Sequence, residues 1–210
     1  MQAGVQRTVI ILVAIIALIM GLVVAKVLRK PALDPQQLAH IGVFLKDPPA
    51  EIAEFELVAQ DGSAFSKNEL RGQWSLLFFG FTYCPDICPA TLAQVAQVKQ
   101  QLDEKMPSAD IQYILVSVDP DRDTPARLQE YVTYFDPAFL GLTGSLQNIY
   151  DFAIGLNAIF AKVPQENGDY LMDHSSNLVL INPEGQYHGF LKTPHKVGNV
   201  VTALQAIIDQ

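Results

Sequence analysis

The sequence predicts an α/β domain built from a βαβ unit and a following ββα unit. Two continuous apolar runs, WSLLFFGF at 74–81 and IQYILVSVD at 111–119, indicate buried strands. Between them, Pro89 to Met106 carries apolar residues at helical spacing. A strand, a helix and a second strand in this order are typical of a βαβ unit, in which the two strands are parallel and the connection is right-handed.

Further elements are expected on both sides of this unit. Asp61-Gly62 between apolar runs indicates an N-terminal hairpin. After the second strand, Thr124 is the expected N-cap of a helix whose first residue is Pro125. The remaining predicted elements are a helix over 146–154, a strand near 158–163, an antiparallel hairpin of 177–181 with 186–190, and a helix over 197–208.

The chain is expected to have three parts: an anchor over 1–30, a tether over 31–49 and the domain over 50–210. Val9 to Ala25 holds no charged or polar side chain, and a membrane span needs about 17–25 such residues. The alternative is a cleaved signal peptide. Four prolines without a clear period predict that 31–49 is a tether.

Charge limits the partners of the domain. All 22 acidic residues and only 10 of the 14 basic residues follow residue 30. This excess of negative charge argues against nucleic acid and against an anionic membrane surface as partners.

The segment FGFTYCPDICPATL (79–92) holds both cysteines of the chain, Cys84 and Cys88. We expect Pro85 to begin a helix, with Cys84 near its N-cap and Cys88 on the same helical face. A helix N-terminus favours thiolates, so the pair can bind one metal or cycle to a disulfide. A purely structural bridge would add little, because it closes a very short loop. Redox chemistry and metal binding remain.

Two thiolates need a further ligand in most metal sites, and His174 is the candidate. It lies in YLMDHSSN, just before the strand at 177–181, where strand ends face the predicted helix start. Asp173 could orient its imidazole from behind. The other histidines (His40, His188 and His195) are expected in ordinary surface or capping roles. Two cysteines and a histidine suit copper, Cu(I) above all, whereas structural zinc takes four ligands.

Three motifs in this order resemble the Sco/SenC family of copper-binding, thioredoxin-like proteins. They are FGFTYCPDICP, VSVDPDRDTP (116–125) and DHSSNLVLINPEG (173–185). The resemblance covers roughly residues 50–208 and includes a single N-terminal anchor.

The resemblance implies a thioredoxin-like fold and a Cu(I) or Cu(II) site formed by Cys84, Cys88 and His174. It also places Asp119 at an acidic family position near that site. The domain would lie in the periplasm, or in the intermembrane space of a eukaryote, although the basic residues after the apolar run, Lys26, Arg29 and Lys30, favour the opposite orientation. Such an oxidising compartment would let Cys84 and Cys88 cycle to a disulfide.

Two functions therefore follow as expectations. The first is a membrane-anchored copper metallochaperone for the binuclear copper centre of cytochrome c oxidase subunit II, or for another copper enzyme. The second is a thiol–disulfide reductase that keeps the cysteines of that centre reduced, which needs Cys84 and Cys88 but not His174. A peroxidase is a weaker third reading, because no arginine can be assigned to Cys84 from the sequence.

Overall fold

The computed structural model describes residues 2–28, 34–166 and 168–209. The chain divides into two compact units, Met1–Leu33 with Gln210, and Asp34–Asp209. The first unit contains helix α1 (Gln2–Leu28). Among the described residues, no helix meets the length and apolarity needed to cross a membrane. The predicted transmembrane helix is therefore not confirmed, and residues 29–33 of the predicted anchor and tether lie outside the described residues.

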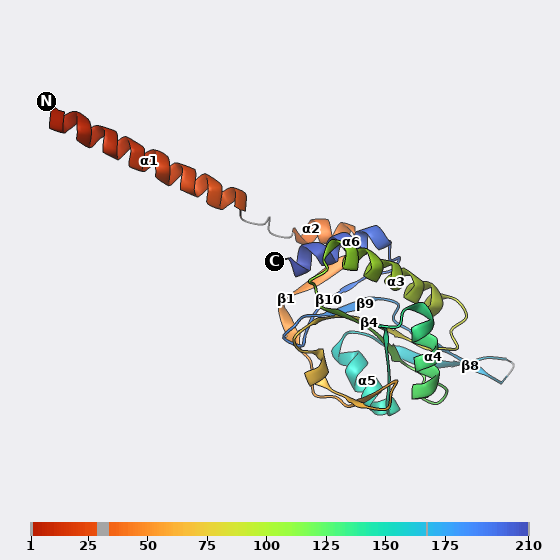
Figure 1. Ribbon diagram of the computed structural model, residues 1–210. Coiled ribbons are helices and arrows are strands. Elements are labelled where there is room, and N and C mark those ends of the chain that lie inside the picture. Colours follow the sequence, from red (N-terminus) through yellow and green to blue (C-terminus); the bar gives the residue numbers. More distant parts are fainter. Residues whose placement is uncertain (1, 29–33, 167, 210) are drawn as a thin grey trace. The chain divides into compact units, whose positions relative to one another are not determined.

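The second unit is built on a mixed sheet, which has eight strands within the described residues (Figure 1). In spatial order the strands are β1 (Val43–Glu51), β10 (Gln186–Leu191), β9 (Leu178–Ile181), β4 (Trp74–Gly80), β5 (Ile111–Ser117), β6 (Leu140–Thr143), β2 (Leu57–Ala59) and β3 (Ala64–Phe65). β4, β5 and β6 run parallel, and β9 pairs antiparallel with β4. The two central strands are almost wholly buried, which matches their continuous apolar sequences.

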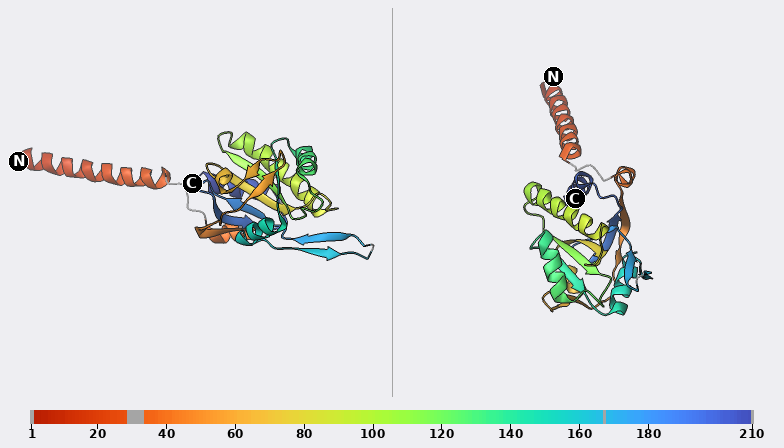
Figure 2. Two further views of the ribbon diagram at one scale, coloured as in Figure 1. Left: turned by 90° about the horizontal axis from the view of Figure 1, so that it is seen from below. Right: turned by 90° about the vertical axis from the view of Figure 1, so that its right-hand side faces the viewer.

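Helices cover both faces of this sheet. Successive strand residues face opposite ways, so Phe78 lies beside Leu92 of α3, whereas the ring of Phe79 packs 6.1 Å from that of Phe152 in α5. The helical elements of the unit are α2 (Pro35–His40), a short 3-10 helix (Lys67–Leu70), α3 (Ile87–Lys105), α4 (Pro125–Phe135), α5 (Leu146–Gly155) and α6 (Val197–Ile208). α6 packs against α3, and the views of Figure 2 show α5 on the other side of the sheet.

The structure confirms the predicted α/β architecture. β4, α3 and β5 form the parallel βαβ unit, and β2 pairs with β3 around Asp61-Gly62. Thr124 caps α4, because its Oγ1 accepts a hydrogen bond from the Arg127 amide at 3.3 Å. β9 and β10 form the antiparallel hairpin that precedes α6.

The segment predicted as a tether differs from the expectation. From residue 35 onward it forms α2 and β1, and β1 pairs with β10 in the sheet. Pro48 and Pro49 argue against a strand in the sequence, because proline has no backbone N–H to donate to a neighbouring strand. β1 tolerates them because it is an edge strand whose register is interrupted between Leu45 and Ala50.

A second, two-stranded sheet carries the third candidate ligand. β7 (Phe160–Pro164) pairs antiparallel with β8 (Tyr170–His174), and Phe160 lies opposite His174. β8 was not among the predicted strands. The left view of Figure 2 shows this hairpin extending away from the main sheet.

Candidate metal centre

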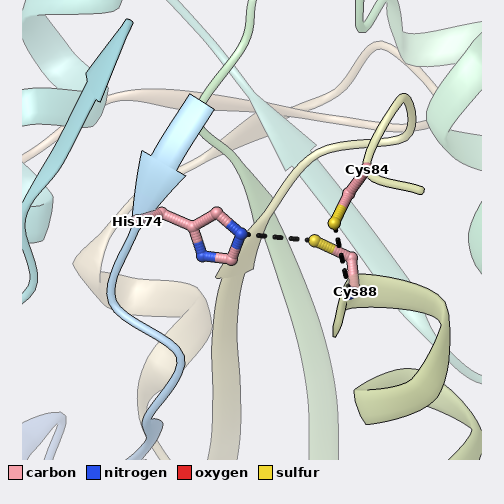
Figure 3. A group of neighbouring side chains, drawn as sticks. All are labelled: Cys84, Cys88 and His174. Carbon is pink, nitrogen blue, oxygen red and sulfur yellow. Dashed lines mark hydrogen bonds between the residues drawn. The ribbon is translucent and has the colours of Figure 1, made fainter. Parts of the chain in front are cut away.

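Three side chains from three separate segments converge at one end of the central strands. Cys84 lies in the loop after β4, Cys88 in the first turn of α3, and His174 at the end of β8. Their ligand atoms all lie within 4.8 Å of one another. Cys88 Sγ is 3.3 Å from His174 Nε2, and Figure 3 shows both sulfur atoms on the same side of the imidazole. The structure thus brings together the three residues that the sequence singled out.

The helix start is displaced from its predicted place. α3 begins at Ile87 rather than at Pro85, and its N-cap is Asp86. A residue before proline is pushed out of the helical region, which leaves Cys84 in the loop. The Cys88 amide donates a hydrogen bond to Cys84 Sγ at 3.4 Å. The sulfur atom thus satisfies one of the amide groups that have no partner within the first turn of the helix.

The two thiols differ in acidity. Burial raises the pKa of the Cys84 thiol, but hydrogen bonds with His174, Cys88 and backbone amides outweigh it and lower this pKa to about 6. Burial strongly raises the pKa of the Cys88 thiol, and the hydrogen bond and charge of Cys84 raise it further. Both cysteines are free, with Cys88 fully buried and Cys84 partly exposed. At neutral pH the first proton therefore leaves Cys84.

The His174 ring is held by its surroundings in an orientation suited to a ligand. Its Nδ1 lies 3.2 Å from the Ser175 carbonyl oxygen, which accepts a hydrogen bond when Nδ1 carries a proton. Nε2 can bind a metal in the form of the ring in which Nε2 carries none. The rings of Phe78 and Phe81 meet the imidazole edge to face, with centroids at 5.7 and 5.9 Å. The predicted role of Asp173 is taken by this carbonyl. Asp173 is exposed, because neighbouring residues of a strand point to opposite faces.

Asp119 joins the loop after β5 to the hairpin that carries His174. Its carboxylate is 2 % exposed and accepts hydrogen bonds from the Tyr170 hydroxyl at 2.7 Å and from Arg122. The guanidinium of Arg122 lies 3.8 Å from the Tyr170 ring centre and 4.8 Å from that of Tyr83. Sequence reasoning missed Arg122 and Tyr170, although Arg122 lies within the quoted motif at 116–125.

The other histidines are not part of this group of three ligands. His40 is exposed, and His188 packs edge to face against Trp74. His195 was expected in a surface or capping role, whereas it is buried and donates from Nε2 to the Ser176 carbonyl at 2.9 Å. It therefore supports the chain just after His174.

Two sulfur donors and one imidazole nitrogen form a compact set of soft ligands. Such a set suits Cu(I), while its three members fall short of the four that structural zinc takes. The same two thiols are close enough to exchange with a disulfide.

A family model described as SCO1/SenC matches residues 45–209. The chain belongs to the SCO1/SenC family. It is 35% identical to the SCO2-like protein of Rickettsia conorii over 196 residues, which covers 91% of this chain and 95% of the relative.

Solved Sco structures share the fold, and some of them are described with copper bound. The copper-bound ScoI of Arabidopsis thaliana superposes with a TM-score of 0.72 at 35% identity, covering 77% of this chain and all of that one (100%). Copper-bound yeast Sco1 gives a TM-score of 0.71 at 31% identity, covering 77% of this chain and 90% of the yeast chain. The predicted family and its thioredoxin-like α/β fold are therefore confirmed.

Proposed function

We propose that this Sco protein is a copper metallochaperone that carries Cu(I) or Cu(II) as cargo on Cys84, Cys88 and His174. The observation that carries the proposal is the convergence of the two sulfur atoms and the imidazole nitrogen within 4.8 Å. The orientation of His174 by the Ser175 carbonyl supports it, because Nε2 is left to bind the metal.

The test is an anaerobic Cu(I) titration of the reduced full chain against a competing chromophoric chelator. Wild type is expected to bind one copper, and His174→Ala and Cys84→Ser are expected to lose affinity by at least about 100-fold, the upper end of effects from losing support at a metal site. His40→Ala is the matched control, because His40 is exposed and its loss should leave the affinity unchanged. Undiminished binding by His174→Ala would remove the histidine from the ligand set.

The recipient of the copper is proposed to be cytochrome c oxidase subunit II or another copper enzyme. A related solved structure, at 27% identity with a TM-score of 0.61, is that of BsSco, described as a member of the Sco family of cytochrome c oxidase assembly proteins. We further propose that the apolar run from Val9 to Ala25 anchors the chain with its domain in the periplasm, or in the intermembrane space of a eukaryote. Relatives described as mitochondrial and as a lipoprotein support an extracytoplasmic, membrane-associated site of action.

The inequality of the two thiols favours a second function, thiol–disulfide exchange with the copper centre of the oxidase. In this reaction the Cys84 thiolate attacks a partner disulfide, and one partner thiolate leaves. The Cys88 thiol then gives up its proton and attacks Cys84 Sγ, which releases the second partner thiol. The Cys84–Cys88 pair ends as a disulfide, and two electrons have passed to the partner.

Trapping distinguishes this reductase from the chaperone. A Cys88→Ser variant lacks the second thiol and should accumulate a mixed disulfide with the partner, which non-reducing electrophoresis detects. His174→Ala should still reduce the partner disulfide, more slowly than wild type because Cys84 loses a hydrogen bond that lowers its pKa, while failing to hold copper. If Cys88→Ser traps no partner while wild type delivers copper normally, the reductase role is rejected.

A further inference from the structure

A buried carboxylate, that of Asp123, contacts the loop that carries Cys84 but is not one of the three proposed copper ligands. Asp123, in the loop between β5 and α4, is fully buried at 0 % exposure. A buried carboxylate is costly unless hydrogen bonds satisfy it. Asp123 meets this need through two residues, Thr82 and Ser117, one of which belongs to the loop that carries Cys84.

Thr82 is held by Asp123 at two points. Its backbone amide donates to Asp123 Oδ2 at 3.0 Å, and its hydroxyl donates to Asp123 Oδ1 at 2.7 Å. The Ser117 hydroxyl, at the end of β5, also donates to Oδ2 at 2.6 Å. Bonds to an ionised carboxylate are short and stronger than neutral ones, and two of them on one residue fix both its position and its orientation.

The same loop is braced from the outside. Arg127 Nε donates to Thr82 Oγ1 at 3.3 Å, so the hydroxyl accepts from Arg127 while it donates to Asp123. One residue earlier than Thr82, the Phe81 carbonyl accepts from the Cys84 amide at 3.3 Å and closes a tight turn. Thr82 therefore lies inside the turn that sets the direction of the Cys84 side chain.

We propose that Asp123 is a positioning residue for copper, which acts through Thr82 to hold Cys84 at its ligand position. The inference rests on the proposed function of the site. Within the described residues Asp123 shares no hydrogen bond with the cysteines or His174. Burial and the negative charge of Asp123 both raise the pKa of the Cys88 thiol, which works against a thiolate ligand, so the favourable effect of Asp123 on the metal passes through the loop. Copper binding by a preformed loop avoids the entropy of ordering that loop on binding.

Two substitutions of Thr82 separate the hydroxyl from the residue's shape. Thr82→Val removes the hydroxyl but keeps the volume and the amide, and it should raise the Cu(I) dissociation constant about 10-fold, or about 1.4 kcal/mol. Thr82→Ser keeps the hydroxyl and should restore the affinity to near that of wild type. Thr143→Val is the matched control, because Thr143 is equally buried at 6 % and its Oγ1 has no hydrogen-bond partner among the described residues.

A second variant keeps the proposal testable if Thr82→Val folds poorly. Asp123→Asn retains the shape but removes one acceptor oxygen and the charge that, together with burial, raises the pKa of the Cys88 thiol. Loss of the charge alone would favour a thiolate ligand, so weaker Cu(I) binding by Asp123→Asn, which we expect, is due to the loop. Urea unfolding of each metal-free variant reports the structural cost separately. While the variant stays folded, lost stability alone does not lower the affinity of its native state, so a purely structural role leaves the dissociation constant unchanged.

Hydrogen exchange supplies a readout without copper. In the reduced, metal-free full chain, the Cys84 and Cys88 amides should exchange about 10-fold faster in Thr82→Val than in wild type, because the loop opens more often. Unchanged copper affinity in both Thr82→Val and Asp123→Asn would overturn the inference. If wild type itself bound no copper, the proposed function would fail. The exchange rates would still test the inference, because equal amide exchange rates in Thr82→Val and wild type would show that Thr82 does not hold the loop in place.

Discussion

Gly80 lies where any larger residue would displace a copper ligand. A methyl group at this last residue of β4 would come within 3.1 Å of Cys88 Sγ, 2.7 Å of Phe78 Cε1 and 3.1 Å of Leu115 Cδ1. Gly80→Ala therefore forces buried side chains apart, and overpacking of this kind costs about 1–3 kcal/mol of unfolding free energy. Suppose that about 1.4 kcal/mol of this strain is relieved when Cys88 moves away from its ligand position. Copper binding must then bring Cys88 back and restore the strain, so the dissociation constant for copper rises about tenfold.

Two measurements on reduced protein test this prediction. Urea unfolding of the metal-free chain gives the stability, and Cu(I) competition with a chromophoric chelator gives the affinity. Gly198→Ala is the control, because Gly198 has open space in α6 and alanine there should stabilise the helix by about 0.5–1 kcal/mol. Wild-type stability together with wild-type affinity in Gly80→Ala would refute the argument that close packing on Gly80 sets the place of Cys88.

Two further predictions concern pH. In the reduced, metal-free chain, the rate of Cys84 alkylation should rise with pH through an apparent pKa of about 6, while Cys88 stays unreactive. Mass spectrometry of the alkylated peptides measures both rates. A midpoint near the ordinary thiol pKa of about 8.5 would contradict the prediction. Burial lowers the pKa of His195, with the Ser176 hydrogen bond acting in the opposite sense, so the unfolded chain takes up this proton at a higher pH than the folded one. The free energy of unfolding should therefore decrease as the pH falls below about 6.5 and through the lower pKa of the folded state. Urea unfolding midpoints at several pH values should show a smaller decrease in His195→Gln than in wild type. Equal decreases in both proteins would show that His195 does not titrate in this way.

The buried strands and the ligand set were the parts that the sequence revealed most directly. Continuous apolar runs predicted β4 and β5, because a strand covered on both faces has no polar alternation. Cys84 and Cys88 stand out through their number and spacing, and residue chemistry alone then restricted the third ligand to a few histidines. The structure places His174, rather than another of the four histidines, beside the two cysteines, since the end of β8 lies at the same edge as the start of α3.

The supporting residues could not be found in this way, because they depend on long-range contacts. β8 alternates exposed and covered residues over only five positions, and its partner β7 was needed to make it a strand. The hydrogen bond between His174 and the Ser175 carbonyl could not be predicted, because a backbone oxygen leaves no trace in a sequence. Asp123 was overlooked for a similar reason: its bonds to Thr82 span 41 residues.

The ligand set is divided between two sheets. The two sulfur atoms belong to the main sheet and its helix, whereas His174 belongs to the β7–β8 ribbon. The imidazole could thus withdraw from a bound ion without the loss of a single ladder bond in the eight-stranded sheet. On the proposed function, such a withdrawal would break the ring contacts with Phe78 and Phe81 and would leave a position on the metal for an incoming donor from the recipient protein.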